Sequence, residues 1–166
     1  MGVTLYYSGT LRSLEHDTAL QRIVLKWAKH WKCDVLEVDQ EHDLMIQMRD
    51  GKVTEYRGPL SGFILFPHPE AESLSLVHAP DGYLWHFCKT QFAGPRTHME
   101  VVEFLEEIAP FFKDFKIVDD GGYWPNRDRK ELERRMGIID GAIDGLSKAF
   151  PVSKKHSDRS PKSGMN

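Results

Sequence analysis

Two loops of the sequence combine a cation, an imidazole, carboxylates and aromatic rings. Residues 94–98, after a predicted strand at 83–92, include Arg96, Thr97 and His98. Residues 119–124, after a predicted strand at 115–118, include Asp119, Asp120, Tyr123 and Trp124. If the strands run parallel and the intervening helix forms a right-handed crossover, both loops lie at one edge of the sheet.

Ligands of open α/β sheets bind at this carboxyl edge. A helix that begins in the first loop would add free N–H groups and the positive end of its dipole. We therefore predict a ligand site at the two loops, with Arg96 as an anion anchor and His98 as an acid–base group. The alternative interpretation is that Asp-Asp-Gly-Gly at 119–122 is a plain turn.

A thiol and an imidazole also share one face of the strand at 83–92, because His86 and Cys88 are two residues apart. Such a pair can act as base and nucleophile, but cysteine is among the most commonly buried residue types, and packing is the favoured interpretation. The eight histidines show no zinc-motif spacing, and no phosphate-binding or dinucleotide-binding glycine loop occurs. We expect no metal and no cofactor.

The predicted last helix, from residue 128 to about 150, contains Gly137, Gly141 and Gly145. Each glycine costs about 1 kcal/mol relative to alanine in a helix interior. The apolar residues predict the core face, and they are Leu132, Met136, Ile139, Ile143, Leu146 and Phe150. The opposite face is either an exposed, weak helix surface or a shallow groove for a partner or a second copy. That groove would be lined by Arg134, Gly137, Ile138, Gly141 and Gly145.

The remaining patterns predict an α+β fold with a mixed, largely antiparallel sheet of about seven strands and three helices mainly on one face. The strands are expected at 3–7, 34–38, 44–48, 52–56, 62–66, 73–78, 83–92 and 115–118. Two hairpins are expected, around Asp50-Gly51 and around Pro80-Asp81-Gly82. The first helix is expected at 14–31, and the other two should begin with the capping boxes Thr97/Glu100 and Asp128/Glu131.

The first two predicted helices have matching apolar positions 81 residues apart, for example Trp27 and Ile108. This favours a duplicated βαβ unit and a pseudo-repeat. The alternative is that any two amphipathic helices between strands align equally well.

Charge is unevenly distributed along the 166 residues. The whole chain carries −3 and residues 151–166 carry +3, so residues 1–150 carry −6. An acidic body argues against nucleic-acid binding. The start lacks the pattern of a secretory signal, and no apolar run is long enough to span a bilayer. We expect a cytoplasmic protein with one globular domain at 1–150 and a disordered basic tail at 151–166.

Two classes of function remain open. The first is an acidic protein-binding module without catalytic activity, of inhibitor or immunity type, with dimerisation through the last helix as one option. The second is a small-ligand-binding protein or enzyme with an anion site at loops 94–98 and 119–124. A pocket between those loops would favour the second class, whereas a filled rim with exposed apolar and acidic patches would favour the first.

Overall fold

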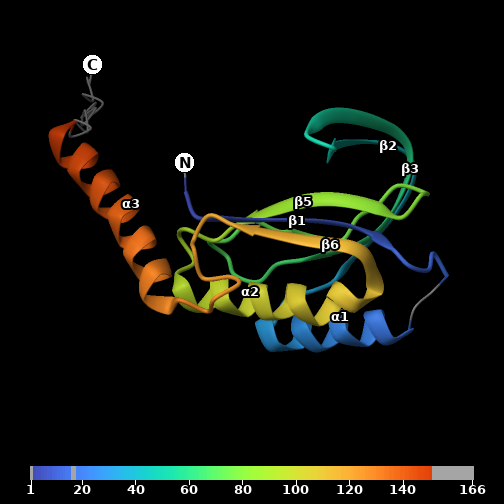
Figure 1. Cartoon of the computed structure of the whole chain (residues 1–166), viewed down its shortest axis with the longest axis horizontal. Coiled ribbons are helices and arrows are strands. Elements are labelled where there is room, and N and C mark those ends of the chain that lie inside the picture. The colour runs from blue at the N-terminus through green and yellow to red at the C-terminus, as the bar shows by residue number, and fades with distance from the viewer. Residues whose placement is uncertain (1, 16–17, 151–166) are drawn as a thin grey trace, which may run out of the picture.

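The computed structural model describes residues 2–15 and 18–150, so the predicted tail lies outside the described residues. Six strands form two three-stranded antiparallel sheets, with orders β5-β1-β6 and β2-β3-β4 (Figure 1). The strands are β1 (Thr4–Leu11), β2 (Leu36–Arg49), β3 (Lys52–Leu65), β4 (Leu74–Ser75), β5 (Tyr83–Lys89) and β6 (Phe112–Asp119). The helices are α1 (Thr18–Trp31), α2 (Pro95–Ile108), a short 3-10 helix (Ala109–Phe111) and α3 (Arg129–Ala149).

The α+β class is confirmed, but the expectation of one sheet of about seven strands is wrong. The strands predicted at 34–38 and 44–48 are two halves of β2, and those predicted at 52–56 and 62–66 are two halves of β3. A register shift between Gln40 and Asp43 lets β2 continue through its polar middle. The turn at Asp50-Gly51 is confirmed, with φ of 50° and 74°, as a two-residue hairpin turn requires.

The second predicted hairpin is wrong in its pairing. Strand β4 pairs with β3, where Ser75 lies opposite Ile64, whereas β5 pairs with β1, where His86 lies opposite Tyr7. The intervening loop does turn, since Gly82 N donates to Ala79 O at 2.9 Å, but the chain passes there from one sheet to the other. As a result β1 is the central strand of its sheet.

Helices α1 and α2 lie side by side on one face of the β5-β1-β6 sheet (Figure 1). They run antiparallel, because Trp27 Nε1 donates to Glu107 at 2.7 Å and Trp31 Nε1 donates to Glu100 at 3.0 Å. The core between helices and sheet is apolar, and its fully buried members include Leu5, Leu84, Val101, Phe104, Leu105 and Ile108.

One of the two predicted capping boxes is correct at its N-cap. Asp128 Oδ1 accepts from Glu131 N at 3.0 Å at the start of α3. The box at Thr97 is wrong, because α2 already begins at Pro95, with Gly94 as its N-cap and no side-chain cap. Proline is favoured at the first helical position because its missing N–H has no intrahelical partner there.

Helix α3 leaves the body after its first two turns (Figure 1). Leu132 and Met136 are buried, whereas Ile143, Leu146 and Phe150 are 42%, 61% and 75% exposed. The prediction of a continuous core face is therefore wrong beyond Met136, and only α1 and α2 lie on the sheet. The pseudo-repeat stays a prediction: α2 connects two strands of one sheet, whereas β2 after α1 enters the other.

Candidate functional site

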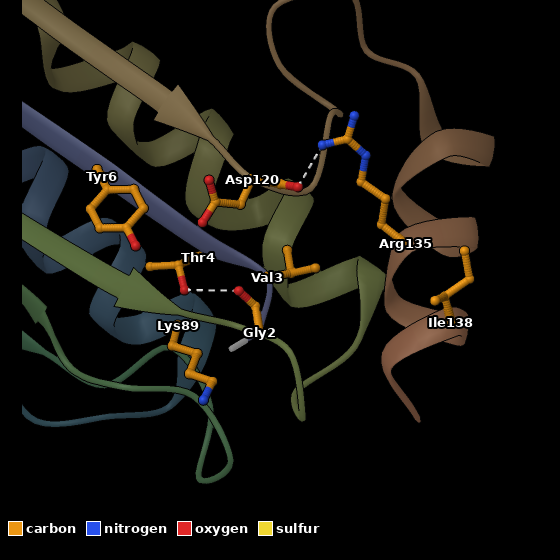
Figure 2. Close-up of a pocket in the computed structure, with 8 residues that line it drawn as sticks. All are labelled: Gly2, Val3, Thr4, Tyr6, Lys89, Asp120, Arg135 and Ile138. Atoms are coloured by element: carbon orange, nitrogen blue, oxygen red, sulfur yellow. Dashed lines mark hydrogen bonds between the residues drawn. The ribbon is translucent and has the colours of Figure 1, made fainter. Parts of the chain in front are cut away.

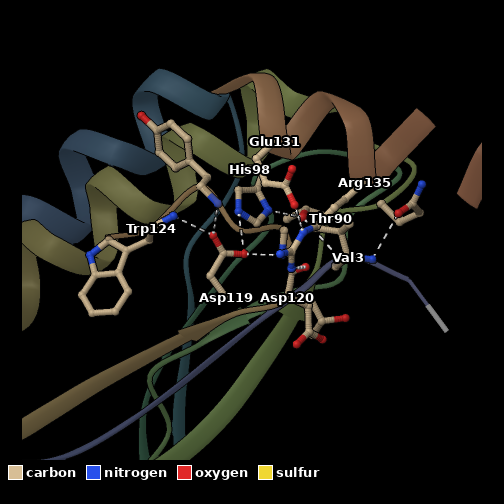
Figure 3. A network of polar contacts seen from close by, with 12 residues as sticks. Val3, Thr90, His98, Asp119, Asp120, Trp124, Glu131 and Arg135 are labelled. Atoms are coloured by element: carbon tan, nitrogen blue, oxygen red, sulfur yellow. Dashed lines mark hydrogen bonds and ion pairs between the residues drawn. The ribbon is translucent and has the colours of Figure 1, made fainter. Parts of the chain in front are cut away.

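The two loops singled out by the sequence meet at one edge of the β5-β1-β6 sheet. Strands β5 and β6 both pair antiparallel with β1, so they run parallel to each other, with α2 between them in the chain. Their carboxyl ends therefore share an edge, as the crossover requires. His98, in the first turn of α2, faces Asp119, the last residue of β6 (Figure 3).

The imidazole of His98 lies between a hydroxyl and a carboxylate. Its Nδ1 is 2.8 Å from Thr90 Oγ1, and its Nε2 is 3.1 Å from Asp119 Oδ1. The second contact has the distance of an ion pair, but its angle is too poor for a hydrogen bond, which leaves Nε2 without a hydrogen-bond partner. We therefore treat the His98–Asp119 contact as electrostatic.

The carboxylate of Asp119 organises the loop that follows β6. It accepts from the backbone N–H groups of Gly121 at 2.6 Å, Tyr123 at 2.9 Å and Trp124 at 2.8 Å. Burial alone would raise the pKa of Asp119, but His98 and the backbone donors outweigh it and hold the pKa below its usual value. The carboxylate thus stays ionised and fixes the loop.

Thr90, His98 and Asp119 have the order of a hydroxyl–imidazole–carboxylate relay. The side chains of His98 and Asp119 have no exposed surface, and Thr90 is also fully buried. A general acid or base must come within hydrogen-bond reach of its substrate. In this conformation the three groups can hold the two loops together but cannot touch a substrate.

The ring of Tyr123 packs against His98, and the indole of Trp124 lies farther out on the same loop. Tyr123 is 8% exposed, and its ring meets the His98 ring edge-on at 6.3 Å. Trp124 Nε1 donates to Glu106 at 3.0 Å, and Arg127 pairs with the same carboxylate. The rim is therefore filled by its own side chains.

The other predicted ligand residues lie in different environments. Arg96 is exposed, and its Nε donates to Glu100 at 3.0 Å. Thr97 is buried, and its hydroxyl donates to Ala93 O at 3.3 Å. Asp120 is exposed on the far side of the loop, where its carbonyl accepts from Arg135 at 2.7 Å. The structure thus brings together His98, Asp119, Tyr123 and Trp124, but not Arg96 or Asp120.

Sequence reasoning missed Thr90 and Gln91, which tie this edge together. Gln91 accepts from Val3 N at 3.1 Å and donates to Met136 O at 3.1 Å, so it joins the residue before β1 to α3. Two polar residues directly after the apolar strand at 83–89 are a signal that could have pointed to them. The predicted interface residues Arg134, Gly137, Ile138, Gly141 and Gly145 are all exposed on α3.

The thiol of Cys88 is unsuited to nucleophilic chemistry. It is fully buried and donates to Glu72 O at 3.2 Å. Burial, together with the charge of Glu72, raises the pKa of Cys88 to about 12. His86 Nε2 is instead 2.6 Å from Val77 O. Both residues connect β5 to the segment at 72–77, in accord with a packing role.

Comparison with protein-family models, with curated proteins and with solved structures finds no match to this chain. Among the described residues, no group of three or more histidine, cysteine, aspartate or glutamate side chains is arranged to hold a metal ion. No helix within 2–15 and 18–150 is long and apolar enough to cross a membrane.

Proposed function

We propose that this chain is a protein-binding module without catalytic activity, of inhibitor or immunity type, and that the ribbon formed by β2 and β3 is its binding surface. The observation that carries the proposal is an apolar row on the open face of this ribbon. The row consists of Leu44, Ile46, Met48 and Val53, which are 44%, 51%, 37% and 68% exposed.

The two faces of the ribbon differ sharply. Met45 and Leu60 are buried with Val77 and Ala79 in a small second core. The apolar row lies on the opposite face, because side chains alternate along a strand, and Val53 is the cross-strand partner of Met48. Contiguous exposed apolar patches are rare on monomers and mark interaction sites.

The edge of the ribbon supports the same function. Within the described residues, β2 pairs only with β3, so its outer edge offers backbone donors and acceptors to a partner strand. The first half of β2 carries Glu37, Asp39, Glu41 and Asp43, all exposed, with no lysine or arginine between residues 36 and 43. A partner with a basic surface would be attracted and oriented by this acidic run.

The alternative is a small-ligand binder or enzyme at loops 94–98 and 119–124. It has less support, because His98 and Asp119 are closed off from solvent and Arg96 is engaged by Glu100. Inorganic phosphate is the simplest probe of an anion site there. We expect phosphate to leave the melting temperature unchanged, whereas a rise that Arg96→Ala abolishes would favour the alternative.

An affinity-capture experiment tests the proposal. Three forms are immobilised: the wild-type protein, the Ile46→Ser variant and the Leu25→Ser variant. Each is exposed to a lysate of the cells in which the protein naturally occurs. Leu25 is a matched control, because it is 53% exposed on α1, away from the ribbon. We expect wild type and Leu25→Ser to retain one or a few proteins. The amount that Ile46→Ser retains should be about tenfold lower, since truncating an apolar anchor costs at least 1 kcal/mol of binding free energy.

Retention of the same proteins at equal levels by all three forms would contradict the use of the ribbon. Melting curves of the variants show whether each is folded. Both substitutions replace an exposed apolar side chain with a small polar one, so neither should change the melting temperature by more than a degree or two.

A further inference from the structure

The β5-β1-β6 sheet has a second face, opposite α1 and α2 (Figure 1). Among the described elements, β2 contacts this face at one end, where Tyr83 Oη donates to Met48 O, and the rest of the face is open. Tyr6, Trp85, Phe87 and Val118 form what we call the aromatic face. The three rings lie within 6.4 Å of one another, centre to centre, and Tyr6 pairs across the strands with both Phe87 and Val118. Phe87 is 46% and Val118 is 60% exposed.

A second uncovered apolar surface lies on α3. Ile143, Leu146 and Phe150, which we call the apolar stripe, follow Leu132 and Met136 at helical spacing and lie on the same side of the helix. Leu132 and Met136 are buried against the body, but the stripe extends beyond it. The buried side of α3 therefore continues as an exposed apolar surface.

The two surfaces cannot meet within one chain. The base of α3 is fixed, since Met136 O accepts from Gln91 and Arg135 donates to Asp120 O. From there α3 continues as one helix to Ala149 and points away from the sheet (Figure 1). Of the residues that the structure describes, none covers either surface, and a second molecule could cover both.

Dimensions and area favour a second copy. Ile143 to Phe150 span about 10 Å along a helix, and three adjacent strands span about 10 Å between the outer two. Five of the seven side chains of the aromatic face and the apolar stripe are 42–75% exposed, and Tyr6 and Trp85 are partly buried. At about 150–200 Å² each, the seven would bury about 600 Å² per copy. A reciprocal dimer would thus bury about 1,200 Å², which exceeds the ~1,000 Å² expected of a specific interface. Pairing of two α3 stripes alone would bury about half of that.

The corner between the aromatic face and α3 leaves room for an incoming helix. A groove of about 500 Å³ opens there and is bordered by Tyr6 and Lys89 from the sheet and by Arg135 and Ile138 from α3 (Figure 2). We infer that the chain forms a twofold dimer in which the apolar stripe of each α3 lies across the aromatic face of the other copy.

Site-directed cross-linking tests this arrangement independently of the β2–β3 ribbon. Two chains are made in a Cys33→Ser background, since Cys33 is the partly exposed native thiol. One carries Leu146→Cys and an affinity tag, and the other carries Phe87→Cys. On mild oxidation of the mixture, we expect a disulfide between the tagged and untagged chains. The matched control replaces Phe87→Cys by Leu25→Cys and should give at least tenfold less of this product.

Two outcomes would overturn the inference. Efficient cross-linking of the Leu146→Cys chain with itself, but not with Phe87→Cys, would show pairing between the α3 helices instead. A single monomeric species in sedimentation velocity across the accessible concentration range would exclude a dimer altogether. If the inference holds, wild type sediments as a concentration-dependent dimer, Trp85→Ser and Leu146→Ser each shift it to monomer, and Leu25→Ser leaves it unchanged.

Discussion

The imidazole of His98 and the carboxylate of Asp119 lie 3.1 Å apart, and neither side chain has any exposed surface. This buried pair joins the start of α2 to the end of β6 and, through three backbone N–H groups, fixes the loop before α3. In this conformation His98 and Asp119 therefore hold the two loops together.

Removing the imidazole should be strongly destabilising. His98→Ala opens a cavity at a fully buried position and removes the imidazole that meets the Thr90 hydroxyl at 2.8 Å, which together cost roughly 2–5 kcal/mol. Urea unfolding measures the free energy. Arg96→Ala is the matched control, because it removes an exposed pair worth less than about 1 kcal/mol. An equal decrease in the free energy of unfolding in the two variants would show that His98 contributes no more to stability than the exposed pair does.

Acid should destabilise the protein partly through Asp119. Its pKa in the folded state lies below its usual value, so its ionised form contributes stability above the unfolded pKa of about 3.9. That contribution declines as the pH falls below about 4 and is lost below the folded pKa. We expect the melting temperature of Asp119→Asn to be lower than that of wild type at pH 7 and to fall less between pH 5 and pH 3. Parallel curves for the two proteins would contradict this.

The two cysteines should differ in reactivity. The pKa of Cys88 is raised to about 12 by burial and by the charge of Glu72, whereas Cys33 is partly exposed. Alkylation at pH 8 followed by mass spectrometry should show one modified thiol, Cys33, in the folded protein and two in urea. Rapid modification of Cys88 in the folded protein would contradict its assignment to the core.

One substitution can show whether self-association uses the apolar stripe of α3 or the opposite face, which carries Gly137, Gly141 and Gly145. A Cβ at Gly141 would have no atom within 4 Å, so Gly141→Ala should stabilise the helix by up to about 1 kcal/mol. Hydrogen exchange of α3 should slow by about fivefold. Self-association should stay unchanged, because the stripe lies on the other side of the helix. Weakened association would instead favour the interface predicted at Arg134, Gly137, Ile138, Gly141 and Gly145.

Local patterns in the sequence predicted several turns and helix starts but not how the strands pair. The turn at Asp50-Gly51, the helix beginning at Asp128 and the parallel relation of β5 and β6 followed from turn chemistry, capping and the crossover rule. The partner of β5 did not, because an apolar alternating strand pairs equally well with several others, and only the tertiary fold selects β1.

The contrast between Leu132 and Phe150 shows the same limit for burial. Both belong to one helical stripe, and periodicity identifies the stripe without indicating where the body ends. In the same way, the residue types of His98 and Asp119 indicated chemistry, whereas their burial depends on the tertiary fold, which places the ring of Tyr123 against His98. Exposure of the β2–β3 ribbon could not be predicted either, since its apolar row alternates like that of a half-buried strand.

Titration calorimetry with the purified captured partner tests most directly whether the β2–β3 ribbon binds a basic protein. Wild type, Ile46→Ser, the double variant Asp39→Asn/Glu41→Gln and the control Leu25→Ser are compared at low and high salt. We predict that Ile46→Ser weakens binding about tenfold, or 1.4 kcal/mol, at both salt concentrations. The double variant should weaken it mainly at low salt, where charges are least screened, and Leu25→Ser should bind like wild type. Equal affinities for all four proteins, without salt dependence, would contradict the account.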